Sequence, residues 1–161
     1  MEQVKIKKPL AWIILTGLLT GTIDALIVIL INYDVPAGSI FKFIASGIFG
    51  KAAFGTGNEM IYYGVLFHYS IAFIWTTVFF LFYTRLITIL KFRSALMLTI
   101  AIVIWMGMNL VVLPLSNTPP QPHHFIGILK NIGILALAYG LPIVVIADKF
   151  YTSPLLLFIE A

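Results

Sequence analysis

Four long apolar runs dominate the chain, and polar residues gather in the stretches between them. The runs are Leu10–Ile31, Met60–Tyr83, Ala95–Leu115 and Phe125–Ala147. Each is long enough for a helix to cross a bilayer, which takes about 20 apolar residues. They lack the regular alternation of apolar and polar positions found in membrane barrel strands. The pattern predicts an all-α fold, an integral membrane four-helix bundle in which residues 1–161 form a single transmembrane domain.

The stretch between the first two runs predicts a further short helix, from Ile40 to about Lys51 with Ser39 as its N-cap. Such a helix is roughly 18 Å long at 1.5 Å per residue, too short to span a bilayer. We expect an amphipathic helix at the outer interface or a re-entrant helix, and the simpler alternative is a lid that covers helix ends. Its apolar face holds Ile40, Phe43, Ile44, Gly47 and Ile48.

Composition agrees with a membrane protein. Of the residues, 61% are hydrophobic and 10% are charged, whereas a soluble domain is about 45–50% apolar and about 25% charged. With no cysteine, disulfides, thiolate metal sites and a cysteine nucleophile are excluded. The first run follows lysines as in a signal peptide, but it is long and no clean cleavage site follows, so we expect a retained helix.

Basic residues predict the orientation, because they are enriched in cytoplasmic loops. If the chain crosses four times, both termini and the loop between the second and third runs share one side. This side holds seven of the ten basic residues, and we therefore expect both termini in the cytoplasm. The seven are Lys5, Lys7, Lys8, Arg85, Lys91, Arg93 and Lys149.

Asp24 is the unusual residue, because it interrupts the most apolar part of the first run. Gly17 and Gly21 form a small-xxx-small pair, which allows helices to pack closely in lipid. Asp24 lies about 20° from Gly17 around the helix at 100° per residue. We therefore expect its carboxylate on the packing face, where an aspartate at the membrane centre costs about 2.5–3.5 kcal/mol without a partner.

The other three runs carry polar residues at a similar depth, roughly 7–12 Å below the outer boundary at 1.5 Å per residue. Gly64 and His68 share a face of the second run, and Asn109 lies in the third. The sequence predicts a buried polar cluster, either functional or structural, formed by Asp24, His68, Asn109, Lys130 and Asn131.

Each member of this cluster also has an ordinary structural explanation. Asp24 could form a lock with Lys130 or His68, Lys130 could snorkel to the headgroups, and His68 could be a neutral histidine bonded to a helix. The two asparagines could join neighbouring helices. We expect no metal, because His123 and His124 are adjacent in a proline-rich turn and rarely bind one ion together with Asp24 and His68. No catalytic set or cofactor motif is present.

Proline and glycine predict a disturbance in the last run. Pro142 has no amide N–H, so the carbonyl of Ala138 loses its helical partner, and Gly140 lies beside it. We expect the helix to bend there.

The segments "FIASGIFGKAAFGTG", "GVLFHYSIAF" and "MNLVVLPLS" resemble those of a group of small four-helix bacterial inner-membrane proteins without an assigned function. The resemblance extends from about Gly17 to Pro142. It implies a bacterial cytoplasmic membrane, and it transfers no catalytic or binding residue.

Two function classes follow from these features. We expect an accessory or scaffold subunit of a membrane assembly, because small-residue faces and polar contacts between helices suit such a role. The alternative is an oligomeric transport or proton-coupled unit that uses the Asp/His/Lys cluster, and an enzyme acting on lipid or quinone ranks third. The expected partners are the lipid bilayer and other membrane protein chains or further copies, with no nucleic acid.

Overall fold

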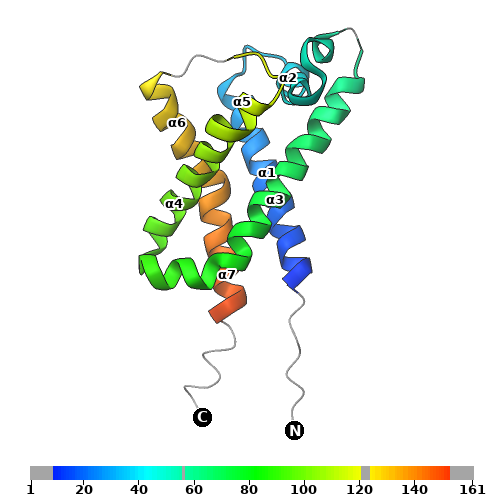
Figure 1. The fold of residues 1–161 in the computed structure, drawn as a ribbon. Coiled ribbons are helices and arrows are strands. Elements are labelled where there is room, and N and C mark those ends of the chain that lie inside the picture. Colours follow the sequence, from blue (N-terminus) through cyan, green and yellow to red (C-terminus); the bar gives the residue numbers. More distant parts are fainter. Residues whose placement is uncertain (1–8, 56, 121–123, 153–161) are drawn as a thin grey trace, which may run out of the picture.

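The computed structural model describes residues 9–55, 57–120 and 124–152, and helices make up nearly all of this part of the chain. Four long helices form a bundle (Figure 1). They are α1 (Pro9–Ile31), α3 (Glu59–Leu90), α4 (Arg93–Met106) continued by α5 (Leu113–Leu115), and α6 (Phe125–Leu135) continued by α7 (Leu141–Thr152). All four are long and apolar enough to cross a membrane. The predicted all-α bundle of four long apolar helices is confirmed.

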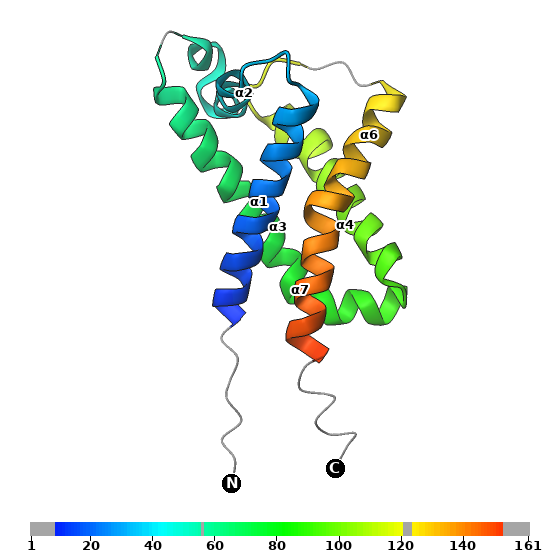
Figure 2. The same ribbon diagram turned by 180° about the vertical axis from the view of Figure 1, so that it is seen from behind.

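The start of α1 and the end of α7 lie at the same end of the bundle, which we call the terminal end (Figures 1 and 2). The short helix α2 (Ala37–Phe49) lies across the opposite end, which we call the α2 end. The predicted short helix is thus present, but Ser39 is not its N-cap. Helix α2 begins three residues earlier than expected, after Pro36, and Ser39 lies inside its first turn.

The second long helix extends beyond its predicted end. The sequence predicts a loop from residue 84 to residue 94, whereas α3 continues to Leu90 and ends at Lys91, which adopts φ 62°. Its 32 residues correspond to about 48 Å at 1.5 Å per residue, more than a bilayer's hydrocarbon core of about 30 Å. The last turns of α3 run across the terminal end instead of along the bundle (Figures 1 and 2).

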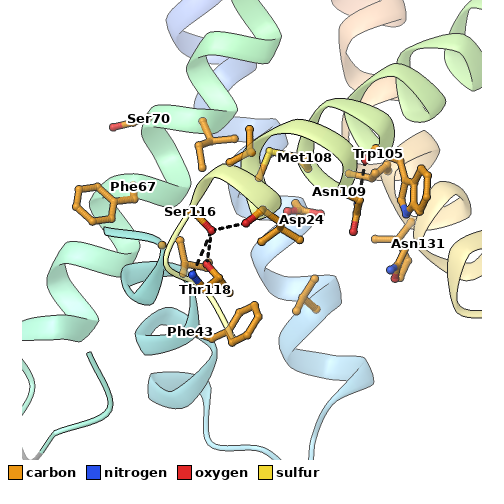
Figure 3. Close-up of a pocket in the computed structure, with 18 of the residues that line it drawn as sticks. Asp24, Phe43, Phe67, Ser70, Trp105, Met108, Asn109, Ser116, Thr118 and Asn131 are labelled. Atoms are coloured by element: carbon orange, nitrogen blue, oxygen red, sulfur yellow. Dashed lines mark hydrogen bonds between the residues drawn. The ribbon is translucent and has the colours of Figure 1, made fainter. Parts of the chain in front are cut away.

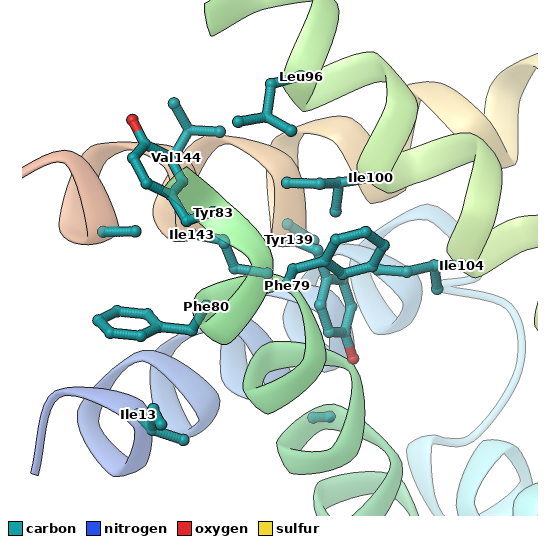
Figure 4. Packing of buried hydrophobic residues seen from close by; sticks show 13 residues of the cluster. Ile13, Phe79, Phe80, Tyr83, Leu96, Ile100, Ile104, Tyr139, Ile143 and Val144 are labelled. Atoms are coloured by element: carbon teal, nitrogen blue, oxygen red, sulfur yellow. The ribbon is translucent and has the colours of Figure 1, made fainter. Parts of the chain in front are cut away.

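The apolar core fills the half of the bundle nearest the terminal end. Figure 4 shows how its side chains pack. Phe80 of α3, Leu96 and Ile100 of α4 and Ile143 of α7 are fully buried in it. Aromatic rings pack together at the terminal end of this core. The Phe80 ring lies against that of Phe150, with 5.3 Å between the ring centroids. The well-packed half therefore holds the four long helices together near the chain ends.

A polar contact secures the same end. Asp148 of α7 accepts a hydrogen bond from the hydroxyl of Tyr83, at 3.0 Å, and forms an ion pair with Arg93, at 2.6 Å. Tyr83 is buried, whereas the Arg93 side chain is 67% exposed. The Tyr83 hydrogen bond thus contributes more to stability than the screened ion pair, because exposed pairs contribute about 0–1 kcal/mol. Asp148 links α3, α4 and α7.

Glycines permit close contacts between helices. A Cβ atom at Gly21 would lie 3.0 Å from the ring of Tyr69 and 3.1 Å from Ala72, both on α3. At Gly17 it would clash with the ring of Phe73. Gly64 faces a different neighbour, because its Cβ would clash with the backbone of Phe41 in α2. The small residues thus bring α1 against α3, and α2 against α3.

Two long helices are interrupted by π-helical segments, Gly107–Val112 between α4 and α5, and Ala136–Gly140 between α6 and α7. In each case a proline, Pro114 or Pro142, follows two residues after the segment. Proline cannot donate a backbone hydrogen bond, and wider i→i+5 turns re-pair part of the backbone. The predicted disturbance near Pro142 therefore takes the form of a π-helical segment, and Pro114 causes a second one that the sequence analysis missed.

Candidate functional site

A cavity of about 760 Å³ lies between the helices beneath α2 (Figure 3). This volume falls within the range of about 300–1,000 Å³ that is usual for small-molecule sites. Every long helix contributes to its wall, with Val28 from α1, Phe67 from α3, Leu113 from α5 and Ile134 from α6. Most of the lining is apolar. The cavity occupies the half of the bundle that the core leaves unfilled.

Helix α2 forms the roof of the cavity. Phe43, Ile44, Gly47 and Ile48 line it, so most of the apolar face predicted for this helix points into the bundle. Asn117, from the connection after α5, holds the roof: its backbone N–H donates to the Gly47 carbonyl at 3.0 Å and its side-chain amide to the Ile48 carbonyl at 3.1 Å. Of the alternatives for this segment, the structure favours a lid that covers helix ends.

Asp24 lines the cavity together with Asn109 and Asn131 (Figure 3). These three members of the predicted cluster come from three different helices, α1, the π-helical segment after α4, and α6. Within the described residues, the Asp24 carboxylate takes part in no hydrogen bond or ion pair, although it interacts electrostatically with His68 and Tyr139. Three of the polar side chains predicted at a similar depth therefore line one cavity. The Asp24 carboxylate is available there to bind a ligand.

His68 is buried, but it is outside the cavity lining. Its Nε2 lies 2.8 Å from the backbone carbonyl oxygen of Gly21 in α1 and therefore donates to it. This is the interhelical bond foreseen as the ordinary alternative for this residue. His68 packs α3 against α1 behind the wall from which Asp24 projects.

Lys130 departs from the prediction. The sequence predicts it in a buried cluster, but the side chain is exposed and is not among the cavity-lining residues. The described residues contain no Asp24–Lys130 ion pair. Asn131 is exposed as well, even though it lines the cavity. The physical reason is that α6 lies at the outside of the bundle, with open space beside Gly127 and Gly133, so this helix buries little of its surface.

The π-helical segment after α4 shapes one wall. The side-chain amide of Asn109 donates to the carbonyl of Trp105 at 2.9 Å. This bond leaves the Asn109 side-chain oxygen as an acceptor near the cavity. Trp105 and Met108 line the same wall. Neither residue was included in the predicted cluster, although Trp105 lies four residues before Asn109 and therefore on the same helical face.

Thr20 and Thr76 are a second omission. Their hydroxyl groups lie 3.1 Å apart at the fully buried contact between α1 and α3. The two threonines within apolar runs could have indicated this contact, because threonine hydroxyls form hydrogen bonds between helices in lipid. The pair holds the cavity wall below Asp24 in place.

The cavity wall is incomplete. Ser70 of α3, Leu115 of α5 and Asn131 of α6 line the cavity and are exposed at the same time. The opening therefore lies at the side of the bundle, between helices, while α2 covers the end.

The described residues contain no group of three or more histidine, cysteine, aspartate or glutamate side chains placed to hold a metal ion. His124 is exposed at the start of α6, and His123 lies outside the described residues. The arrangement can bind a ligand through one carboxylate, neutral amides and hydroxyls, and apolar contacts.

No known protein family matches the chain in a comparison with family models, and no curated protein or solved structure matches it either. Family membership stays a prediction from the resemblance of the three quoted segments.

Proposed function

We propose that the four long helices span a lipid bilayer, with α2 resting at its outer face. Large apolar side chains cover the outside of the bundle, and Leu15, Leu30, Ile74 and Leu110 are each more than half exposed. Soluble monomeric proteins rarely expose so much apolar surface to water. In a bilayer this apolar surface would contact lipid chains.

We further propose that both termini are cytoplasmic and that the membrane is the bacterial inner membrane. The support for the orientation is the charge on the terminal end. Arg85, Arg93 and Lys149 belong to helices that meet there, and Lys91 lies in the turn between α3 and α4. The support for the bacterial membrane is the resemblance given above.

Single cysteines test this orientation, because the chain has none of its own. Tyr33→Cys lies at the α2 end and Phe92→Cys at the terminal end, and both wild-type side chains are exposed, by 89% and 69%. We expect a membrane-impermeant maleimide to label Tyr33→Cys in intact cells, and Phe92→Cys only after the membrane is opened. Labelling of Phe92→Cys in intact cells would contradict the proposal.

We propose that the protein binds a small, mostly apolar molecule within the bundle. The observation that carries this proposal is the cavity of about 760 Å³ with Asp24, Asn109 and Asn131 in an otherwise apolar wall. Apolar sites with a few converging polar groups are typical of small-molecule binding. Of the two function classes left open by the sequence, this favours the transport or proton-coupled unit, because transport requires a binding site for a small molecule.

Filling the cavity tests this function. Val28 lines it, whereas Leu26 on the same helix is 53% exposed and lies outside it. We expect the wild type in nanodiscs to bind the neutral fluorophore N-phenyl-1-naphthylamine saturably, above the signal of empty nanodiscs. Val28→Trp should lower the affinity at least tenfold, because the indole occupies the site, and Leu26→Trp should leave it unchanged. Equal binding by both variants would refute the cavity as the site.

A second candidate is the accessory or scaffold subunit. It is favoured by α6, which exposes the polar side chains of Lys130 and Asn131 in an apolar helix. Polar side chains are costly against lipid, so another chain or a second copy that covers α6 would stabilise them. The two candidates are compatible, because a ligand-binding bundle can belong to an assembly.

A further inference from the structure

The charge of the cavity is set by one residue. Within the part of the chain that the structure describes, Asp24 is the only ionisable side chain that lines it. The remaining polar groups are neutral amides and hydroxyls, contributed by Asn32, Ser70, Asn109, Ser116, Thr118 and Asn131. No lysine, arginine or histidine within the described residues lines this cavity. A ligand inside it therefore meets one acidic group and, among the described residues, no basic group.

The chain leaves this carboxylate open to a ligand. Among the described residues it has no hydrogen-bond donor, and Lys130 is exposed away from the lining. His68 interacts with it electrostatically, but the histidine uses Nε2 to donate to Gly21 and lies behind the wall. A carboxylate in a water-poor site is stabilised by a cation close to it. A cationic ligand in the cavity would provide this stabilisation of the Asp24 carboxylate.

Three aromatic side chains complete the environment. Phe43 of the roof, Phe67 of α3 and Trp105 of α4 line the same cavity. The faces of such rings attract organic cations, most strongly the face of tryptophan. The remaining wall is apolar and suits the hydrocarbon part of a ligand.

We infer that the ligand of this cavity is a lipophilic organic cation, with Asp24 as its counter-ion and the aromatic rings around its apolar groups. This inference rests on the proposed function and names the class of molecule that the site binds. It makes Asp24 a specificity-determining residue: the apolar wall provides the space, and the carboxylate selects the sign of the charge.

Two ions of the same shape and opposite charge test the inference, tetraphenylphosphonium and tetraphenylborate. Binding is measured to the wild type in nanodiscs, after subtraction of empty nanodiscs because the two ions partition differently into lipid. We expect the wild type to bind the phosphonium at least tenfold more tightly than the borate. This comparison needs no variant, so it stands whether or not substitutions affect folding.

Asp24→Asn then assigns the preference to the carboxylate. The variant should lower phosphonium affinity at least tenfold and leave borate affinity unchanged or higher. Its melting temperature should stay close to that of the wild type, because the Asp24 carboxylate makes no hydrogen bond within the described residues. The matched control is Asp34→Asn, at an exposed carboxylate outside the cavity, and it should retain the wild-type preference.

The outcomes separate the inference from the function on which it rests. Saturable binding of N-phenyl-1-naphthylamine without a preference for the phosphonium, or a preference that survives Asp24→Asn, would overturn the inference and leave the binding function intact. Absence of saturable binding of all three probes would overturn both.

Discussion

Replacing Phe80 by alanine should cost about 2–4 kcal/mol of unfolding free energy. Phe80 is fully buried, and its ring packs against Phe150 and Tyr151 with centroid distances of 5.3 and 5.7 Å. In soluble proteins a buried Phe→Ala change costs about 3–5 kcal/mol, partly through the cavity it leaves. In lipid the transfer contribution is small, so lost packing dominates, and we expect the lower part of that range.

The measurement is reversible unfolding in mixed micelles of increasing dodecyl sulfate content, followed by tryptophan fluorescence. Phe125→Ala is the matched control, because it is the same chemical change at a side chain that is 73% exposed. It should cost less than about 0.5 kcal/mol, as surface substitutions usually do. Similar losses in the two variants would mean that the core near the terminal end is not the main source of stability.

Replacing Gly64 by leucine should displace the roof of the cavity. A Cβ atom at this position would clash with the Phe41 backbone in α2, and backbone cannot rotate away as a flexible side chain can. We expect a loss of about 3 kcal/mol, the upper end of the range usual for overpacking. The affinity for N-phenyl-1-naphthylamine should fall at least tenfold, because Phe43, Ile44 and Ile48 leave the site with the roof.

The control is Gly127→Leu in α6, another helical glycine, beside which an added Cβ meets nothing within 4 Å. It should leave both stability and probe affinity near the wild-type values. Unfolding is measured in the mixed micelles used for Phe80→Ala, and the probe titration in nanodiscs, on protein from the same preparation. If Gly64→Leu retains wild-type affinity, the cavity does not need α2 as a roof.

The positions of the helices along the chain were predictable because apolar length and helical periodicity are local properties of the chain. The four long runs and the short helix after the first of them required no knowledge of tertiary contacts. Their ends were less accessible. The stretch after Tyr83 combines apolar with basic residues, as a loop or a surface helix would, and only packing at the terminal end decides that α3 continues to Leu90.

The candidate site was predictable only in part, for a physical reason. Counting residues along a straight helix indicates the depth of a side chain, and this brought Asp24, Asn109 and Asn131 to one level. Depth does not say how the helices are rotated or spread. His68 is therefore hydrogen-bonded to the Gly21 carbonyl of α1 and does not line the cavity, and Lys130 is exposed on α6. The cavity itself depends on packing that no local pattern records.

The side opening of the cavity affects how ligands would be selected. If the helices span a bilayer as proposed, a ligand that enters between them arrives from lipid, and occupancy follows its mole fraction in the membrane rather than its concentration in water. Each added methylene group favours the membrane by about 0.8 kcal/mol, roughly a fourfold gain in partitioning. Moving that group from lipid to an apolar wall adds little. Chain length would then tune the apparent aqueous affinity through the membrane, while the protein itself would discriminate by charge.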